Sequence, residues 1–436
     1  MVKKTVIIGA GPSGLLLAHY LLKRDRQYQV DIYERRPDPR AISVARSRTF
    51  PIALNERGMD AISQIPGLEA AVTAISVKMQ GTIIHGRNGK QRHIPRQKSL
   101  TTLDRTELTK VFLDTLEQQN YGDRLKLNFN HDCRQVDLTA RQVRFTNSDS
   151  EPFVSTVDYD LIIGADGAHS RVRKSFLDTK LFEIEQKYIN NDYKSIFLAT
   201  GDDPQSQKIL ESGKIHTWRL KDGTVIILLH QFDGSMAGVI HFPRDNNQIV
   251  KLKNATEAWQ FFKQNFSEVG ELISASEAAA FFARPVATTL TIRCNRYHYD
   301  DSALLIGDAA HAVSPALGQG CNSALEDVKI LGQLLDRYGD DLSLVLEEFT
   351  KSRLADAHAV VELSNHTLPF AQSLFIELIV RQRLAKLLHR LFPQRFLPPL
   401  FDALNESSIP YAKIFHKYES WCNKVKKSKS EFSSAI

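Results

Sequence analysis

Residues 5–36 read TVIIGAGPSGLLLAHYLLKRDRQYQVDIYERR, and this stretch decides the fold. Its apolar start at 5–8 predicts a buried strand, and the apolar run at 15–22 predicts a helix packed on a sheet. Gly9, Gly11 and Gly14 lie between them in a GxGxxG spacing. A second strand is expected to end at Glu34, twenty residues beyond Gly14. The stretch therefore predicts a βαβ unit and an α/β fold.

Each part of this unit has a mechanical role in dinucleotide binding. Gly9 permits the tight turn, Gly11 allows a pyrophosphate to approach the backbone, and Gly14 lets the helix pack on the strand. The helix N-terminus attracts phosphate groups, and Glu34 can accept hydrogen bonds from ribose hydroxyls. A glycine-rich turn of purely structural origin is the alternative. The register of strand, motif, helix and terminal acid favours dinucleotide binding.

In two later segments a strand, a glycine turn and a helix are expected in the same order. Residues 158–174 read DYDLIIGADGAHSRVRK, and residues 304–328 read LLIGDAAHAVSPALGQGCNSALEDV. Asp166 and Asp308 each follow a strand that is expected to be buried. Either acid alone could be an ordinary turn residue. Together the three segments predict one sheet folded around a single extended ligand.

Length and composition limit the class of protein. The chain has 436 residues, which favours two or three domains, and its 42% hydrophobic content is in the globular range. No apolar run reaches the 18 residues or so of a membrane span. The four cysteines lack CxxC or zinc spacing, which favours a reducing compartment, a cytoplasmic location and no metal site.

The net charge of +6 is mild, and its densest internal patch is HGRNGKQRHIPRQK at 85–98. Nucleic-acid binding would require interleaved aromatic residues, which this patch lacks. We expect a solvated hairpin, and the alternative is steering of an anionic substrate or cofactor phosphate.

The rest of the chain predicts two further regions. Residues 190–290 alternate apolar and polar residues in several runs, which predicts an antiparallel sheet joined by a strand around 81–84. Residues 344–425 have helical periodicity. The expected limits are 1–75, 100–185 and 290–343 for a discontinuous FAD-binding domain, 76–99 and 186–289 for a β-sheet substrate domain, 344–425 for a helical region, and 426–436 for a disordered tail.

The order and spacing of the three glycine segments resemble the single-component (class A) FAD-dependent aromatic hydroxylases. This resemblance implies a Rossmann-like FAD domain, an antiparallel substrate domain and a C-terminal helical region. It also implies FAD as cofactor, NADPH or NADH as a transient reductant, and O2. In that class a small aromatic substrate is hydroxylated through a flavin C4a-hydroperoxide, so we assign no catalytic side chain.

Within this class, residues 45–62, 103–113 and 318–336 look most like the kynurenine 3-monooxygenase family. The motifs and this resemblance together predict a set of cofactor-binding residues. They are Gly9, Gly11, Pro12, Ser13, Gly14, Tyr33, Glu34, Arg35, Arg36, Arg46, Ala53, Arg105, Cys133, Asp166, Gly307, Asp308, Pro315, Gly318, Gly320, Cys321 and Asn322. Arg105 would contact the pyrophosphate, and Asp308 the ribityl chain or the pyrophosphate. Arg46 could instead steer the phosphates of the nicotinamide cofactor.

The helix expected after Gly320 has a further role in this scheme. Its unpaired N–H groups and positive dipole end would stabilise negative charge on the pyrimidine edge of the reduced flavin. Gly318 and Gly320 let the backbone come close, and Pro315 stiffens the approach. No second Rossmann motif for NAD(P)H is present, which fits transient docking.

The substrate positions depart from the family pattern. The family's carboxylate-binding arginine aligns with Thr82 and its tyrosine with Arg96, while an asparagine falls near Thr367 and only Tyr411 keeps its type. Thr82 has no charge and cannot hold a carboxylate in a bidentate clamp. We therefore expect a small aromatic or polycyclic substrate other than L-kynurenine. The alternatives are a tetracycline-type antibiotic hydroxylase, a flavin-dependent reductase, or a slow-turnover regulator on the same fold.

Overall fold

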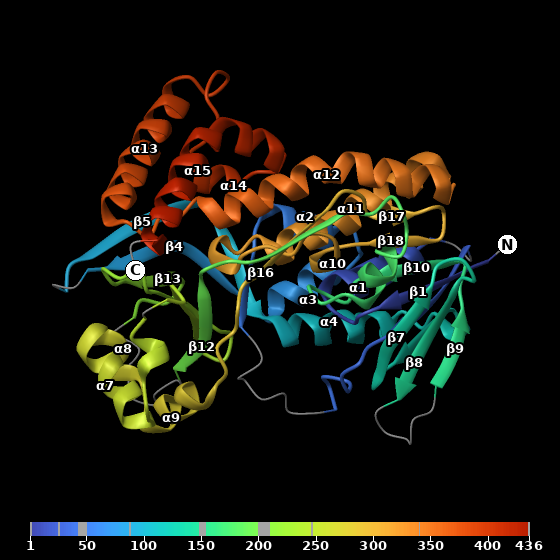
Figure 1. The fold of residues 1–436 in the computed structure, drawn as a ribbon, viewed down its shortest axis with the longest axis horizontal. Helices are drawn as coiled ribbons and strands as arrows, with labels where there is room; N and C mark the ends of the chain where they lie inside the picture. Colours follow the sequence, from blue (N-terminus) through green and yellow to red (C-terminus); the bar gives the residue numbers. More distant parts are fainter. Residues whose placement is uncertain are drawn as a thin grey trace.

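The computed structural model describes residues 2–24, 27–41, 50–86, 89–147, 154–198, 210–245, 247–339 and 341–434. It contains a mainly parallel sheet, a larger mixed sheet beside it, and a group of C-terminal helices that covers both (Figure 1). None of the helices in these ranges is long and apolar enough to cross a membrane.

The parallel sheet has six strands. In spatial order they are β17 (His298–Tyr299), β18 (Ala303–Leu305), β10 (Leu161–Gly164), β1 (Lys3–Ile8), β2 (Tyr28–Tyr33) and β6 (Leu125–Asn128). All pairs are parallel except β17–β18. The strands of the three glycine segments, β1, β10 and β18, are direct neighbours, so their carboxyl ends share one edge. The prediction of one sheet that brings these segments together is confirmed.

Close backbone approach explains two of the glycines. Gly9 follows β1 with φ +105°, and a Cβ there would lie 2.5 Å from the carbonyl oxygen of Ala165. On helix α1 (Pro12–Leu22), a Cβ on Gly14 would lie 2.2 Å from the carbonyl oxygen of Gly9. Both contacts involve backbone atoms, which cannot move aside cheaply, so both positions require glycine.

The larger sheet has seven strands. In spatial order they are β12 (Asp192–Leu198), β15 (Met236–Phe242), β14 (Val225–His230), β13 (Lys214–Arg219), β4 (Val77–His85), β5 (Gln91–Asp104) and β3 (Pro51–Leu54). Neighbouring strands of this sheet pair antiparallel, except β13 and β4, which pair parallel. The expected sheet and its strand near 81–84 are therefore present. Strand β5 runs across the predicted domain limit at 99/100, and the domain limits themselves stay a prediction.

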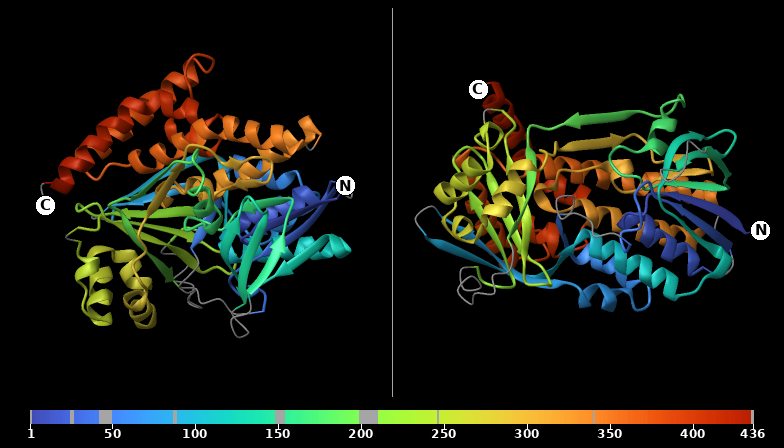
Figure 2. Two further views of the ribbon diagram at one scale, coloured as in Figure 1. Left: turned by 45° about the vertical axis from the view of Figure 1, so that its right-hand side comes forward. Right: turned by 90° about the horizontal axis from the view of Figure 1, so that it is seen from below.

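Three helices that the alternation of residues 190–290 did not predict pack on this sheet. They are α7 (Ala255–Asn265), α8 (Ser267–Leu272) and α9 (Ala275–Ala283). Phe261, Phe262 and Phe281 join a hydrophobic cluster with the sheet residues Ile226 and Ile240. Figure 2 shows these helices on one face of the sheet and the C-terminal helices on the other. The face of the sheet that is turned toward the C-terminal helices lines a cavity.

The C-terminal region is helical, as expected. It comprises α12 (Leu342–His366), α13 (Gln372–Leu391), α14 (Leu400–Asn405) and α15 (Tyr411–Ser434). The prediction that 426–436 is a disordered tail is wrong for residues 426–434, because α15 continues to Ser434. Trp421 and Val425 are buried in a cluster with α12, and the Lys429 ammonium donates to the Asn365 carbonyl oxygen at 2.7 Å. These contacts hold a segment whose polar composition alone suggests disorder.

The remaining elements lie between these strands and helices along the chain. They are α2 (Glu56–Ser63), α3 (Leu68–Ala74), α4 (Arg105–Gln118), α5 (Arg171–Phe176), α10 (Asp308–His311), α11 (Gly320–Tyr338), three 3₁₀ turns at Gly122–Arg124, Ile249–Lys251 and Pro315–Leu317, and the small sheets β7 (His131–Asp137), β8 (Gln142–Asn147), β9 (Val154–Asp158) and β11 (Ile184–Tyr188) with β16 (Leu290–Cys294).

Candidate functional site

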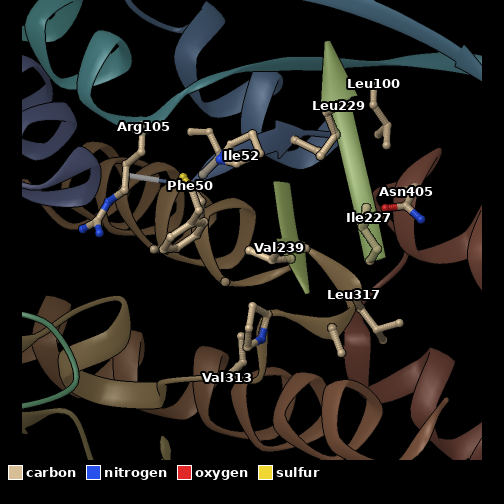
Figure 3. A pocket seen from close by; sticks show the side chains of 18 of the residues that line it. Phe50, Ile52, Leu100, Arg105, Ile227, Leu229, Val239, Val313, Leu317 and Asn405 are labelled. Carbon is tan, nitrogen blue, oxygen red and sulfur yellow. The ribbon is translucent and has the colours of Figure 1, made fainter. Parts of the chain in front are cut away.

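A cavity of about 390 Å³ lies where the carboxyl edge of the six-stranded sheet meets the seven-stranded sheet and the start of α11 (Figure 3). Several predicted site residues line it. They are Gly11, Pro12, Ser13, Ala53, Thr82, Arg96, Arg105, Asp308, Pro315, Gly318, Gly320 and Cys321. The cavity thus collects residues from all three glycine segments and from both sheets.

The wall formed by α1 and α4 is suited to phosphate groups. Helix α1 begins after Gly11 with no side-chain cap and no acid in its first turn, so its N–H donors remain available. Arg105 reaches the same wall (Figure 3), and its guanidinium lies 3.9 Å from the position of a Cβ on Gly11. A pyrophosphate here would meet a fixed cation as well as helix N–H groups.

Asp308 provides the acid of this wall. Its side chain is open to the cavity but enclosed by the protein, so its surroundings are less polar than bulk water. This desolvation raises its pKa, and the charges of Arg105, His311 and Arg173 lower it in part. The carboxyl group is therefore placed to accept hydrogen bonds from hydroxyl groups of a ligand that lies between it and Arg105.

The second strand was predicted to end at Glu34; β2 ends one residue earlier, at Tyr33, and Glu34 is bonded to the glycine turn. The backbone N–H groups of Ala10 and Arg36 donate to its two carboxylate oxygens, each at 3.0 Å. Tyr33 stacks on Phe145 with ring centroids 4.0 Å apart and does not line the cavity. Glu34 thus fixes the loop geometry and keeps oxygen lone pairs for ribose hydroxyls.

The wall opposite is the turn before α11. Gly318 has φ +65°, and α11 begins at Gly320 with no side-chain cap and no acid in its first turn. Gly320 and Cys321 line the cavity, so the unpaired N–H donors of this helix start at its wall. Burial raises the pKa of the Cys321 thiol to about 12, which keeps it protonated.

A buried amide network holds this turn in place. The Asn322 amide donates to the carbonyl oxygens of Ala53 and Gly318, at 2.8 and 2.9 Å. Its oxygen accepts from the Asn55 backbone, and the Asn55 amide donates to the Gln319 oxygen at 3.2 Å. Asn322 was predicted to contact the cofactor, but the structure places it behind the turn. Asn55 and Gln319 were not predicted, although Asn55 before Glu56 has the signature of a helix N-cap.

A second unpredicted network lies under α11 and consists of charged groups. Arg353, which is fully buried, donates to Asp327 at 2.8 Å and to Glu326 at 3.0 Å. Asp327 also accepts from the Gly307 N–H at 2.9 Å and contacts His311 at 2.6 Å. Although burial opposes it, His311 and Arg353 lower the pKa of Asp327, so the carboxylate is charged. Gly307 is therefore fixed from behind the cavity.

Other predicted residues lie away from the cavity wall. Cys133 is buried in β7, Arg35 is exposed, and Asp166 accepts from the backbone N–H groups of Arg171 and Val172 at the start of α5. Arg46 lies outside the described residues.

Two of the four predicted substrate residues are also absent from the wall. Thr367 is buried at the end of α12, while the next residue, Leu368, lines the cavity. Tyr411 is buried and donates to the Gln319 oxygen at 3.0 Å, with the Arg57 guanidinium over its ring. Tyr411 therefore acts on the cavity only through the Gln319 turn.

The half of the cavity that is lined by the seven-stranded sheet is mostly apolar. Its apolar lining includes Phe50, Ile52, Leu100, Ile215, Ile227, Leu229, Val239, Leu317 and Phe401 (Figure 3). Tyr193 also lines the cavity. Such a surface favours a flat, apolar ligand.

Arg96 is the cation of this half. It lies in an irregular segment of β5, where the register with β4 jumps from Met79–Leu100 to Gly81–Pro95. Its Nε is buried without a hydrogen-bond partner. Burial lowers the pKa of Arg96, and the charges of Glu406 and Asp402 raise it in part.

The polar groups of this site fit FAD. Two uncapped helix starts and Arg105 offer donors at the cavity wall, Asp308 offers an acceptor there, and the Glu34 carboxylate is bonded to the adjoining glycine turn. Bound FAD supplies the redox and oxygen-transfer chemistry. The chain supplies binding, orientation and exclusion of water.

Sequence comparison assigns the class. The FAD binding domain family matches residues 3–364, and the chain belongs to that family. It is an FAD-dependent, NAD(P)H-using monooxygenase of the class A aromatic-hydroxylase type.

Within this class the chain is similar to enzymes named kynurenine 3-monooxygenase. The protein of Sus scrofa is 30% identical over 433 residues, covering 96% of this chain and 87% of that protein. The protein of Flavobacterium psychrophilum is 29% identical, covering 94% and 90%.

Solved structures share the fold at lower identity. The tetrameric form of 2-methyl-3-hydroxypyridine-5-carboxylic acid oxygenase has a TM-score of 0.65 and 17% identity, covering 84% of this chain and 90% of that one. Pseudomonas aeruginosa PqsL in complex with 2-aminobenzoylacetate has a TM-score of 0.64 and 20% identity, covering 84% and 95%.

Proposed function

We propose that this monooxygenase hydroxylates a small aromatic or polycyclic substrate other than L-kynurenine, and that Arg96 binds an acidic or carbonyl group of that substrate. The observation that carries the proposal is the pairing of an uncharged Thr82 with a cationic Arg96 on the wall of the same apolar cavity. Arg96, on β5, has a guanidinium where the family pattern has the phenol of a tyrosine, and its Nε has no partner. The positive charge that contacts the substrate would therefore come from β5 and not from β4.

The FAD contacts are part of the same proposal. Arg105 and the α1 start would hold the pyrophosphate, Asp308 the ribityl region, and Glu34 the ribose. The N–H groups at Gly320 and Cys321 would stabilise charge on the pyrimidine edge of the flavin. The apolar lining would exclude water from the reacting end of the cavity.

L-Kynurenine is the competing substrate, because the similar proteins are named kynurenine 3-monooxygenase. The two candidates differ in the chemistry that each requires at the cavity wall. An α-amino acid substrate needs a carboxylate clamp and a site for the ammonium group. Thr82 supplies neither charge.

The test is substrate-dependent NADPH oxidation by the FAD-loaded protein, with the hydroxylated product identified by mass. L-Kynurenine is compared with aromatic carboxylic acids, phenols and tetracycline-like polycyclic compounds. We expect product from one of the latter classes and none from L-kynurenine. Hydroxylation of L-kynurenine at ordinary catalytic rates would overturn the proposed substrate class. Slow NADPH oxidation with every compound and no oxygenated product would favour a reductase or regulator.

The role of Arg96 is tested on the substrate found in this way. Arg96→Met should raise KM for the acidic substrate about ten-fold or more, since a charge-assisted hydrogen bond contributes roughly 1.5–3 kcal/mol. Thr82→Val, on the neighbouring strand and the same wall, is the matched control and should change KM little. Equal effects of the two variants would contradict a charge-specific role for Arg96.

A further inference from the structure

A second, smaller cavity lies behind the substrate wall. It has a volume of about 50 Å³ and shares Ile227, Ala316 and Leu368 with the large cavity. Its wall comes from the seven-stranded sheet, the Ser314–Ala316 turn, the end of α12 and helix α15. Figure 1 shows the end of α15 beside β13, where this cavity is formed. We name it the Arg219–Lys429 cavity after the two cations that line it.

Within the described residues, the hydrogen bonds of both cations go to neutral carbonyl oxygens, and the charge of Asp222 also acts on Arg219 and raises its pKa in part against burial, which lowers it. Arg219 donates to the carbonyl oxygens of Pro369 and Phe370, at 2.7 and 2.6 Å, and Lys429 donates to that of Asn365. No ion pair within the described ranges joins either side chain to a carboxylate. Burial, together with the charge of Arg219, lowers the pKa of Lys429 to about 8.

Three neighbouring side chains also have polar atoms without partners. His241 is buried, and neither of its ring nitrogens has a hydrogen-bond partner. The hydroxyl oxygen of Ser364 and the side-chain oxygen of Asn365 are buried without a partner as well. An unpartnered buried polar group costs about 1–3 kcal/mol. Two cations, a ring N–H and a hydroxyl thus line one small space as donors, together with one acceptor, the Asn365 side-chain oxygen.

We propose that the Arg219–Lys429 cavity binds one small monovalent anion, of the size of a halide, nitrate or formate ion. An anion accepts hydrogen bonds from every one of these donors and offsets the repulsion between the two cations. Water can occupy the same volume, since one molecule needs roughly 10–15 Å³, but water leaves that repulsion in place. The volume excludes large anions.

The site would join three parts of the fold. Arg219 and His241 belong to the substrate sheet, Lys429 to α15, and Ser314 to the turn that leads to the flavin-facing start of α11. A bound anion would therefore stabilise the docking of the C-terminal helices on the substrate wall. This inference is independent of the proposed substrate.

The test uses the FAD-loaded full chain at constant ionic strength, with gluconate exchanged for chloride, bromide, nitrate or formate. We expect the small anions to raise Tm by several degrees in the wild type. Lys429→Met should abolish the increase, and Lys427→Met, an exposed lysine on the same helix, should retain it. An equal response of all three proteins, or no response in the wild type, would overturn the proposal.

Diffraction from bromide-soaked crystals of the wild type gives a second readout that does not depend on a variant folding. An anomalous peak between Arg219 and Lys429 is expected. A cavity that holds only water at saturating bromide would refute the site. If Lys429→Met does not fold, Arg219→Gln replaces it in the Tm comparison.

Discussion

Arg105 and Asp308 show how single residues acquire opposite tasks in one cavity. Both lie at the start of a helix, and both line the space between the two sheets. The cation faces the α1 start, where phosphate charge is favoured, while desolvation raises the pKa of the acid. The same cavity can therefore hold an anionic pyrophosphate at one point and hydroxyl groups at another.

Replacement of Arg105 should weaken FAD binding. Arg105→Met removes a charge-assisted contact of about 1.5–3 kcal/mol, which corresponds to a roughly ten- to hundred-fold increase in the FAD dissociation constant. Quenching of flavin fluorescence on titration of the apoprotein measures this constant. Lys110→Met, a partly exposed lysine of the same helix that pairs with Glu107 and does not line the cavity, should leave it unchanged. Equal dissociation constants for Arg105→Met and wild type would show that Arg105 does not contact FAD.

Some residue roles could be predicted from the sequence and others could not. The positions of the strand-ending glycines and of Asp308 at the sheet edge could be predicted, because a local motif fixes both their backbone and their place there. Asp166 also follows its strand, but it bonds the start of α5 and does not line the cavity. Thr367 and Tyr411 were placed by alignment, and the structure keeps both off the cavity wall. Their positions depend on how α12 and α15 pack, and no local pattern encodes that packing.

At the scale of elements, helix α15 differs most from what the sequence predicts, because it continues to Ser434. Its residues after Lys424 are mostly polar, so composition favours disorder. Trp421, Cys422 and Val425 nevertheless lie on one face and pack on α12. The three helices α7–α9 were also missed, because the strand-like alternation around them dominated the pattern. Tertiary burial, which a sequence window does not contain, decides both cases.

A charge placed on the buried face of α15 should destabilise the protein. Val425 is 0% exposed, so Val425→Asp buries an unpaired carboxylate and should cost about 3 kcal/mol or more of unfolding free energy. Asn423→Asp makes the same charge change of one unit at an exposed position of the same helix and should cost about 0.5 kcal/mol or less. Urea denaturation of the two variants measures the difference. Similar midpoints would mean that this part of α15 is not docked.

At the scale of the whole molecule, the charged network under α11 connects the FAD sheet to the C-terminal helices. Arg353 on α12 bonds Asp327 on α11, and Asp327 bonds the turn at Gly307. Arg57 on α2 belongs to the same network, because its guanidinium donates to the Glu326 carboxylate at 2.7 Å. Because these groups are buried, removal of one partner leaves an uncompensated charge, which typically costs about 3–5 kcal/mol.

This network predicts an acid-dependent loss of stability. The folded-state pKa of Asp327 lies below its unfolded value of about 3.9, so its contribution is present above that value and disappears as the pH falls through the folded-state pKa. Asp327→Asn should lower the urea midpoint at pH 7 and flatten its decline below about pH 4. Urea midpoints measured from pH 3 to 7 test this. Parallel curves for variant and wild type would contradict the assignment.

The cavity is assembled from residues as far apart as Gly11 and Asn405. During synthesis, the first glycine turn leaves the ribosome long before its partners at β10 and β18 exist. The turn at Gly318 follows only after about three quarters of the chain, and the wall at Asn405 comes later still. The cavity proposed to hold FAD is consequently complete only once the chain has been synthesised through Asn405, and a shorter nascent chain exposes an incomplete, apolar half-cavity. Supply of the cofactor during expression should therefore govern the yield of folded enzyme more than any early folding step.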